Sequence, residues 1–122
     1  MADLGTVTVT EETNGHIKKI AFVWTSDADG KATKTTLNSY SGEIIRLVTV
    51  PDETDAPDDN YDVVINDEDS TDILMGAGAN RDTANTEQVL ASSLGCVAND
   101  QLSLSITNAG NKKKGTVYLY IR

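Results

Sequence analysis

The segment Leu102–Ile121 reads LSLSITNAGNKKKGTVYLYI and contains two stretches in which every second residue is aliphatic. These aliphatic residues are Leu102, Leu104 and Ile106 in the first stretch and Val117, Leu119 and Ile121 in the second. A period of two residues is typical of a β-strand that buries one face. Because the intervening segment 108–115 is polar and contains glycine, we expect it to turn and the two strands to form a β-hairpin.

Alternation of this kind extends over most of the chain. The other segments that we expect to be strands are 6–10, 16–25, 31–37, 43–50 and 61–65. Segment 87–94 suits either a short helix or a strand, and we favour the strand. Turn-forming pairs such as Asn14–Gly15 separate them, and Pro51 ends the strand before it because proline has no amide hydrogen. With no long helical pattern, the sequence predicts one all-β domain over residues 1–122, a jelly-roll-like β-sandwich of about eight short antiparallel strands.

Three of these segments differ in the faces they present. Segment 31–37 is rich in threonine and lysine and is expected at a sheet edge, where lysines discourage further pairing. Segment 43–50 is apolar on both faces and is expected centrally or at a subunit contact. One face of segment 43–50 is expected to carry Ile45 and Leu47, and the other Ile44, Val48 and Val50. In segment 16–25, Ile20, Phe22 and Trp24 share one face, which we expect to belong to the core.

Composition argues against several classes of function. The net charge of −9 over 122 residues disfavours a nucleic-acid partner, since phosphate binding needs clustered cations. No run of about 18 apolar residues suits a membrane span, and the first residues lack the features of a signal peptide, so we expect synthesis in the cytoplasm. His16 follows a turn and is expected to be exposed, and Cys96 is expected to be a small buried thiol. We assign no catalytic residue and expect no enzyme activity.

The acidic residues are concentrated in one part of the chain. Ten of the nineteen lie in segment 52–72, and no lysine or arginine occurs from residue 47 to residue 80. Within this segment, Asp67, Asp69 and Asp72 offer oxygen ligands of the kind that Ca²⁺ prefers. The spacing departs from a calcium-binding loop, and aspartates also stabilise ordinary turns by accepting hydrogen bonds from nearby backbone, which is the alternative interpretation.

Two further sets of residues are candidates for contact with a partner. Asp58 and Asp59 belong to the acidic segment, which suits either docking against a basic surface or simple solvation. Tyr118 and Tyr120 alternate with the aliphatic residues of the last strand. They are candidate contact anchors if they face solvent, but in an isolated sandwich we favour packing of both rings against the second sheet.

The chain resembles a family of small proteins encoded among the virion structural genes of tailed bacteriophages. The residues that carry the resemblance are Ile17–Ile20, Trp24–Asp27 with Gly30, Gly42–Arg46, Tyr61–Val63, Asp72–Leu74 with Gly76 and Gly78–Asn80, Asn108–Asn111, and Gly115–Arg122. The resemblance implies a component of the virus particle, most naturally a capsid decoration or cement protein that binds the major capsid protein or other virion proteins, as a homo-oligomer. It implies no catalytic residue and no cofactor.

Other functions remain open from the sequence. A place in the head-to-tail connector, the tail or the baseplate fits the same resemblance. A calcium- or carbohydrate-binding β-module is an alternative of another class, although aromatic residues make up only 5% of the chain and sugar-binding sites use them for stacking.

Overall fold

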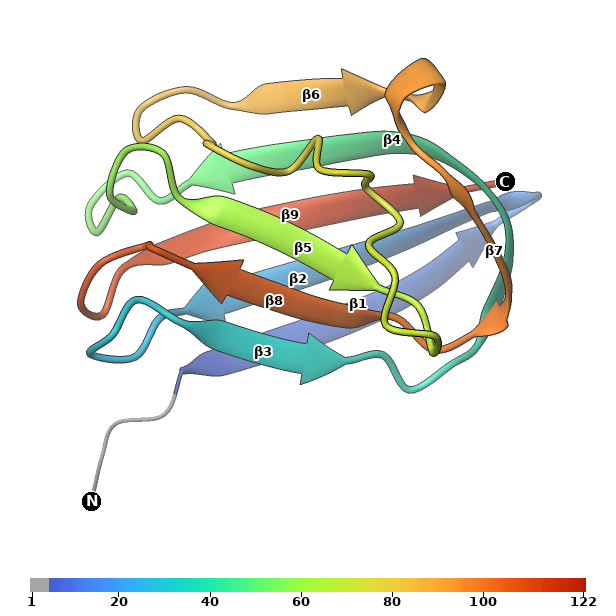
Figure 1. Ribbon diagram of the computed structural model, residues 1–122, viewed down its shortest axis with the longest axis horizontal. Coiled ribbons are helices and arrows are strands. Elements are labelled where there is room, and N and C mark those ends of the chain that lie inside the picture. The colour runs from blue at the N-terminus through green and yellow to red at the C-terminus, as the bar shows by residue number, and fades with distance from the viewer. Residues whose placement is uncertain (1–4) are drawn as a thin grey trace.

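The computed structural model describes residues 5–122, which form nine strands and one three-residue 3₁₀ turn (Figure 1). The strands are β1 (Thr6–Asn14), β2 (Ile17–Thr25), β3 (Ala32–Thr35), β4 (Tyr40–Pro51), β5 (Asp62–Asn66), β6 (Glu87–Leu90), β7 (Cys96–Asp100), β8 (Ser103–Thr107) and β9 (Lys114–Ile121), and the 3₁₀ turn is Ala91–Ser93. Strand accounts for 54% of the chain. No helix of the described residues is long and apolar enough to cross a membrane.

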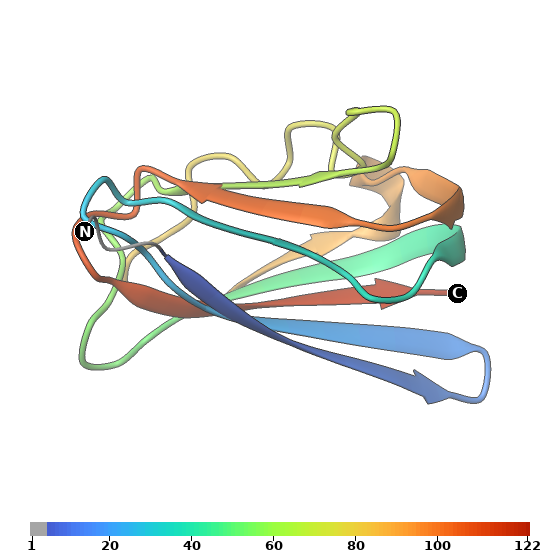
Figure 2. The same cartoon turned by 90° about the horizontal axis from the view of Figure 1, so that it is seen from below.

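Two antiparallel sheets face each other (Figure 2). The larger has the order β1-β2-β9-β4-β6, with β7 also pairing with β4, and the smaller has the order β3-β8-β5. From β2 onward, every connection but one crosses from one sheet to the other. The exception is the connection from β6 to β7, because both of these strands belong to the larger sheet. This wrapping is that of a jelly roll, and the predicted β-sandwich is confirmed.

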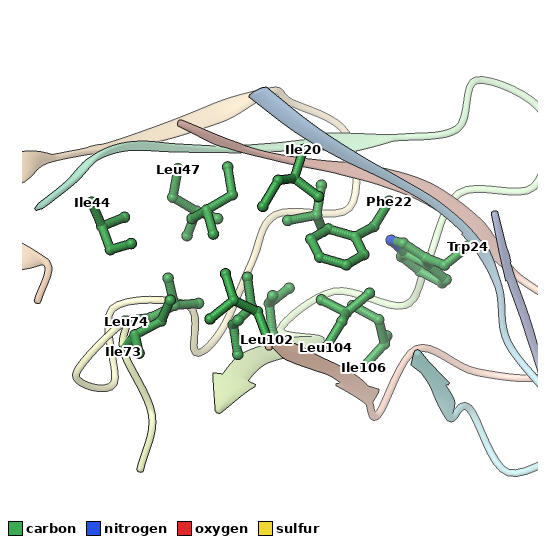
Figure 3. Close-up of a cluster of buried hydrophobic side chains, with 14 of the residues drawn as sticks. Ile20, Phe22, Trp24, Ile44, Leu47, Ile73, Leu74, Leu102, Leu104 and Ile106 are labelled. Carbon is green, nitrogen blue, oxygen red and sulfur yellow. The ribbon is translucent and has the colours of Figure 1, made fainter. Parts of the chain in front are cut away.

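The hydrophobic core fills the space between the sheets (Figure 3). The larger sheet contributes fully buried side chains at alternate positions, as the sequence predicted for Ile20, Phe22 and Trp24. Leu104 and Ile106 face them from the smaller sheet, and their side chains are also buried. A period of two on both layers therefore produces one continuous core.

The expected hairpin between the last two strands is wrong. β8 pairs with β3 and β5 in the smaller sheet, whereas β9 pairs with β2 and β4 in the larger sheet. The connection between them crosses from one layer to the other, and Ala109 is buried within it. Each strand buries one face, but β8 and β9 lie on opposite sides of the core. Alternation of apolar residues is the same for two such strands as for the two strands of a hairpin, so it cannot distinguish the two arrangements.

The faces predicted for segment 43–50 are also wrong. Ile44 and Leu47, which were expected on opposite faces, are both fully buried in the core. The register between β4 and β9 shifts between Ile44 and Arg46. Such a β-bulge inserts an extra residue, so the alternation changes phase and Ile45 no longer shares a face with Leu47.

Cys96 is exposed, contrary to the expected buried thiol. It begins β7, a strand that the sequence analysis did not predict. The neighbouring Val97 takes the core position and is 5% exposed. Since adjacent residues of a strand point to opposite faces, burial of the valine turns the thiol outward.

Candidate interaction surface

The outer face of the larger sheet presents two tyrosines side by side. Tyr118 and Tyr120 lie on β9 between buried Val117, Leu119 and Ile121. The smaller sheet covers only the opposite face, and no strand of residues 5–122 lies over this one (Figure 2). The expected packing of the two rings against the second sheet is therefore wrong, and both side chains are partly exposed.

The register across the sheet determines the neighbours of these tyrosines. Tyr120 lies between Lys19 of β2 and Arg46 of β4. Tyr118 lies in the next row, between Ala21 and Val48. Two cations, two aromatic rings and aliphatic side chains thus form one surface, which we call the tyrosine face.

The cations of the tyrosine face lie against the rings. The ammonium of Lys19 is 4.9 Å from the ring centroid of Tyr118 and 5.8 Å from that of Tyr120. The guanidinium carbon of Arg46 is 5.1 Å from the ring centroid of Tyr120, and its Nε donates to Oε1 of Gln88 at 2.9 Å. These cation–π contacts hold the rings in place and leave positive charge at the surface.

Exposed aliphatic side chains border the tyrosine face. Val23 on β2 is 53% exposed and Leu90 on β6 is 67% exposed. At one end of the face lies a cleft of about 270 Å³, where Val23 and Val50 meet Asp52 and Glu53 of the loop after β4. The face therefore carries the cations Lys19 and Arg46, with Glu12 of β1 across from Lys19, and bears Asp52, Glu53 and Lys114 at its other end.

Asp58 and Asp59 do not belong to this surface. Both are exposed in the loop between β4 and β5. The Asp58 backbone N–H donates to the Ala109 carbonyl at 2.9 Å, and an Asp59 carboxylate oxygen accepts from the Thr83 N–H at 3.3 Å. The structure thus separates the two acidic contact candidates from the two tyrosines.

Asp67 and Asp72 hold turns. Oδ1 of Asp67 accepts from the backbone N–H of Asp69 at 2.9 Å and of Thr71 at 3.0 Å. Asp72 accepts from three backbone N–H groups, those of Ile65, Leu74 and Gly76, at 2.9 to 3.2 Å. Within residues 5–122 no three acidic, histidine or cysteine residues are arranged to hold a metal ion. The geometry favours the turn interpretation of Asp67, Asp69 and Asp72.

Several other acidic residues of segment 52–72 have the same role. Asp52 accepts from the N–H groups of Thr54 and Asp55, and these hydrogen bonds lower the pKa of Asp52. Glu68 accepts from the Gln101 N–H at 2.9 Å. Much of the negative charge of this segment is therefore used to satisfy the backbone of long connections.

A polar cleft near the loop end of the β1–β2 hairpin was not predicted from the sequence. It has a volume of about 460 Å³ and is lined by Glu11, Thr13, Lys18 and residues 38–41. The Glu11 carboxylate accepts from the Leu37 N–H at 2.9 Å, the Asn38 N–H at 3.1 Å and the Tyr40 hydroxyl at 2.5 Å. Burial and this hydrogen bond raise the pKa of Tyr40, so its hydroxyl stays protonated as a donor. No local pattern marks Glu11, because all its partners lie more than 25 residues away.

His16 is exposed in the two-residue loop between β1 and β2, as predicted. That loop consists of Gly15 and His16, one residue later than the expected turn, and Asn14 still pairs with Ile17. The structure therefore leaves His16 away from the other candidate residues.

Comparisons with known proteins concern the fold alone. No protein-family model and no curated protein matches the chain. A solved carbohydrate-binding module of the β-sandwich superfamily, described as having promiscuous specificity, is similar at 13% sequence identity with a TM-score of 0.37. The match covers 100% of this chain and 56% of the other, so the chain spans little more than half the length of that module.

Proposed function

We propose that this protein is a structural component of a tailed-phage virion, a decoration protein that docks on the major capsid shell through the tyrosine face. The choice of docking surface rests on one observation, that Tyr118, Tyr120 and two cations lie together on an uncovered sheet face. The virion setting rests on the sequence resemblance described above.

The composition of the tyrosine face suits a protein partner. Tyrosine and arginine are enriched among the residues that contribute most to protein interfaces, and Lys19 and Arg46 also provide charge complementarity to carboxylates. The exposed Val23 and Leu90 add apolar area that contact would remove from water. A shell surface bearing carboxylates around an apolar centre is the partner that this chemistry fits.

The same contacts disfavour a sugar ligand. A sugar ring stacks on the open face of an aromatic side chain, but the Lys19 ammonium is 4.9 Å from the Tyr118 centroid and occupies that space. Displacing the cation would cost the cation–π contact before any stacking was gained. A connector, tail or baseplate position uses the same docking chemistry and differs only in location.

The proposal is tested first by imaging the particles that contain this protein. Density for the protein in many copies on the outside of the shell, with β9 against a capsid subunit, is the expected result. Density at a vertex or along the tail would replace decoration with a connector or tail function. Absence of the protein from purified particles would overturn a virion function altogether.

A binding assay tests the surface itself. Purified protein is added to shells that lack it, and the Tyr118→Ser, Tyr120→Ser double variant is expected to bind at least tenfold more weakly. The matched control is Leu37→Ser with Met75→Ser, which removes side chains that are 83% and 69% exposed elsewhere on the molecule. Equal binding by the tyrosine variant and the wild type would exclude the tyrosine face as the docking surface.

A further inference from the structure

β1 is the outermost strand of the larger sheet and pairs only with β2. The two are joined by a two-residue loop, and the pair Asn14 and Ile17 closes it. In such a hairpin the closing pair exchanges hydrogen bonds, and every second pair along the ladder does the same. The backbone groups of the intervening residues, Val7, Val9, Glu11 and Thr13, therefore point away from β2.

These outward-facing groups are available for pairing. The hydrogen bonds found within residues 5–122 include none to the backbone N–H or C=O of these four residues. Val7 and Val9 pack their side chains against the core, so the strand is held in an extended conformation. β1 thus offers a row of unpaired donors and acceptors on a rigid edge.

The other three sheet edges are protected. β3 has only four residues and carries Lys34, with Lys31 just before it. β5 is covered by the segment that follows it, with bonds from Val63 N–H to the Gly78 carbonyl and from Ile73 N–H to the Ile65 carbonyl, both 2.8 Å. β6 and β7 together form the remaining edge, beside β4. β6 has four residues and runs directly into the 3₁₀ turn, and β7 has five residues and pairs with β4 through a register shift between Tyr40 and Gly42. Short strands, lysines and covering segments are the means by which proteins prevent unwanted edge pairing.

β1 has none of these protections. It has nine residues, its pairing with β2 has no register shift, and it contains no lysine or proline. Its first five residues, Thr6–Thr10, alternate threonine and valine, which have high β-propensity. Its glutamates lie at the hairpin end, and the Glu11 carboxylate is already bound by Leu37, Asn38 and Tyr40.

We infer that β1 is an assembly edge at which a second copy of this chain adds its own β1 in antiparallel orientation. The strand is suited to pair with itself. A two-fold axis at Val9 places Val9 against Val9 and Thr8 against Thr10 of the other copy, and each Glu11 faces a Val7. A parallel arrangement would instead bring the glutamates of the two strands together, which like charges disfavour.

The consequence is one sheet that continues across two copies. Antiparallel edge pairing joins the larger sheets side by side, so the two tyrosine faces form one surface on the same side of the assembly. This pairing involves the β1 edge and leaves the tyrosine face free. It is tested on the isolated protein, without capsid shells. Its failure would leave the proposed docking on a shell untouched, and the reverse also holds.

Proline substitution provides the first test. The Val9 N–H points away from β2, so Val9→Pro removes an outward donor without removing a bond of the β1–β2 ladder. Val9→Ala is the matched control, since it shortens the same side chain and keeps the N–H. In sedimentation equilibrium we expect dimers for the wild type and for Val9→Ala, and monomers for Val9→Pro. A wild type that is monomeric at all concentrations up to about 1 mM, or a Val9→Pro variant that remains dimeric, would overturn the inference.

Disulfide trapping gives a second test that does not depend on the folding of the proline variant. In a Cys96→Ser background, Thr8→Cys and Thr10→Cys proteins are prepared separately and then mixed under mild oxidation. The proposed register brings residue 8 of one copy opposite residue 10 of the other, within the Cα separation that a disulfide spans. We expect a cross-linked dimer in the mixture and at least tenfold less in either variant alone. Equal cross-linking in all three samples, or none in the mixture, would refute this pairing.

Discussion

Removal of the Glu11 carboxylate should destabilise the protein far more than its position on a sheet edge suggests. Glu11 lies on β1 of the larger sheet. Its hydrogen-bond donors Leu37 and Asn38 lie on the connection from β3 to β4, and Tyr40 is the first residue of β4. The carboxylate therefore ties the outermost strand of one layer to a crossover from the other. Glu11→Ala leaves the hydroxyl of Tyr40, a residue that is 7% exposed, without its acceptor.

The expected cost follows from the exposure of the donors. A hydrogen bond to a charged group contributes about 1.5–3 kcal/mol. The N–H groups of Leu37 and Asn38 are exposed and can bind water instead, so only the bond from Tyr40 counts in full. We expect a loss of about 2–3 kcal/mol in the free energy of unfolding. With an m-value of about 2 kcal/mol per molar urea, the unfolding midpoint should fall by about 1–1.5 M.

Urea unfolding of two neighbouring variants tests this reasoning. Glu12 is adjacent to Glu11 but exposed on the outer face, so Glu12→Ala should change the free energy of unfolding by no more than about 0.5 kcal/mol. Equal midpoints for Glu11→Ala and Glu12→Ala would refute the role assigned to the carboxylate. Tyr40→Phe should recover part of the loss in the Glu11→Ala background, because it removes the donor left without a partner.

The same carboxylate predicts a pH dependence. Burial alone would raise the pKa of Glu11, but the hydrogen bonds from Tyr40, Leu37 and Asn38 outweigh it and lower the pKa below its ordinary value. The folded state therefore binds the proton less readily than the unfolded state, and the stabilisation is present above the unfolded pKa. The stability difference between wild type and Glu11→Gln should shrink as the pH falls through the folded pKa. A difference that grew with acidification would contradict the assignment.

Three other substitutions have outcomes that follow from the close contacts and hydrogen bonds of the replaced residues. Gly115→Ala would place its Cβ 2.6 Å from Cζ2 of the fully buried Trp24, and we expect a loss of about 1–3 kcal/mol, measured by urea unfolding and by a shift in tryptophan fluorescence. Asp72→Ala removes the acceptor of three backbone N–H groups and should cost about 1–2 kcal/mol in the same assay. Asp69 takes part in the turn through its backbone N–H and not through its carboxylate, so Asp69→Ala should leave the unfolding midpoint unchanged. Added Ca²⁺ should not raise the unfolding midpoint of the wild type or of any of these variants.

Most strand positions could be predicted from the sequence because alternation is a local property. Ile20, Phe22 and Trp24 share the core face as expected, and the segment around Ala32–Thr35 forms a sheet edge. β6 begins at Glu87 as predicted but gives way to the 3₁₀ turn at Ala91. β7 was missed because Cys96–Asp100 contains only one core residue and so shows no alternation of its own.

The candidate site was predictable only in part. The alternation of β9 separates Tyr118 and Tyr120 from the aliphatic core residues, but the side that faces solvent depends on which sheet receives the strand. Lys19 and Arg46 were not singled out, because they reach Tyr120 from strands that are about 100 and 74 residues away in the chain. Cross-strand neighbours of this kind carry no sequence signal until the register is known.

The sequence by itself determined the all-β class, the spacing of the strands and which face of most of them is apolar. These follow from the preferences of single residues and their immediate neighbours. Only the tertiary structure decided that β8 and β9 lie in different layers, that a bulge at Ile44 changes the phase of β4, and that β1 is left with an open edge. The physical reason is that strand pairing and layer choice depend on contacts between distant segments, and one alternating pattern satisfies several of them equally well.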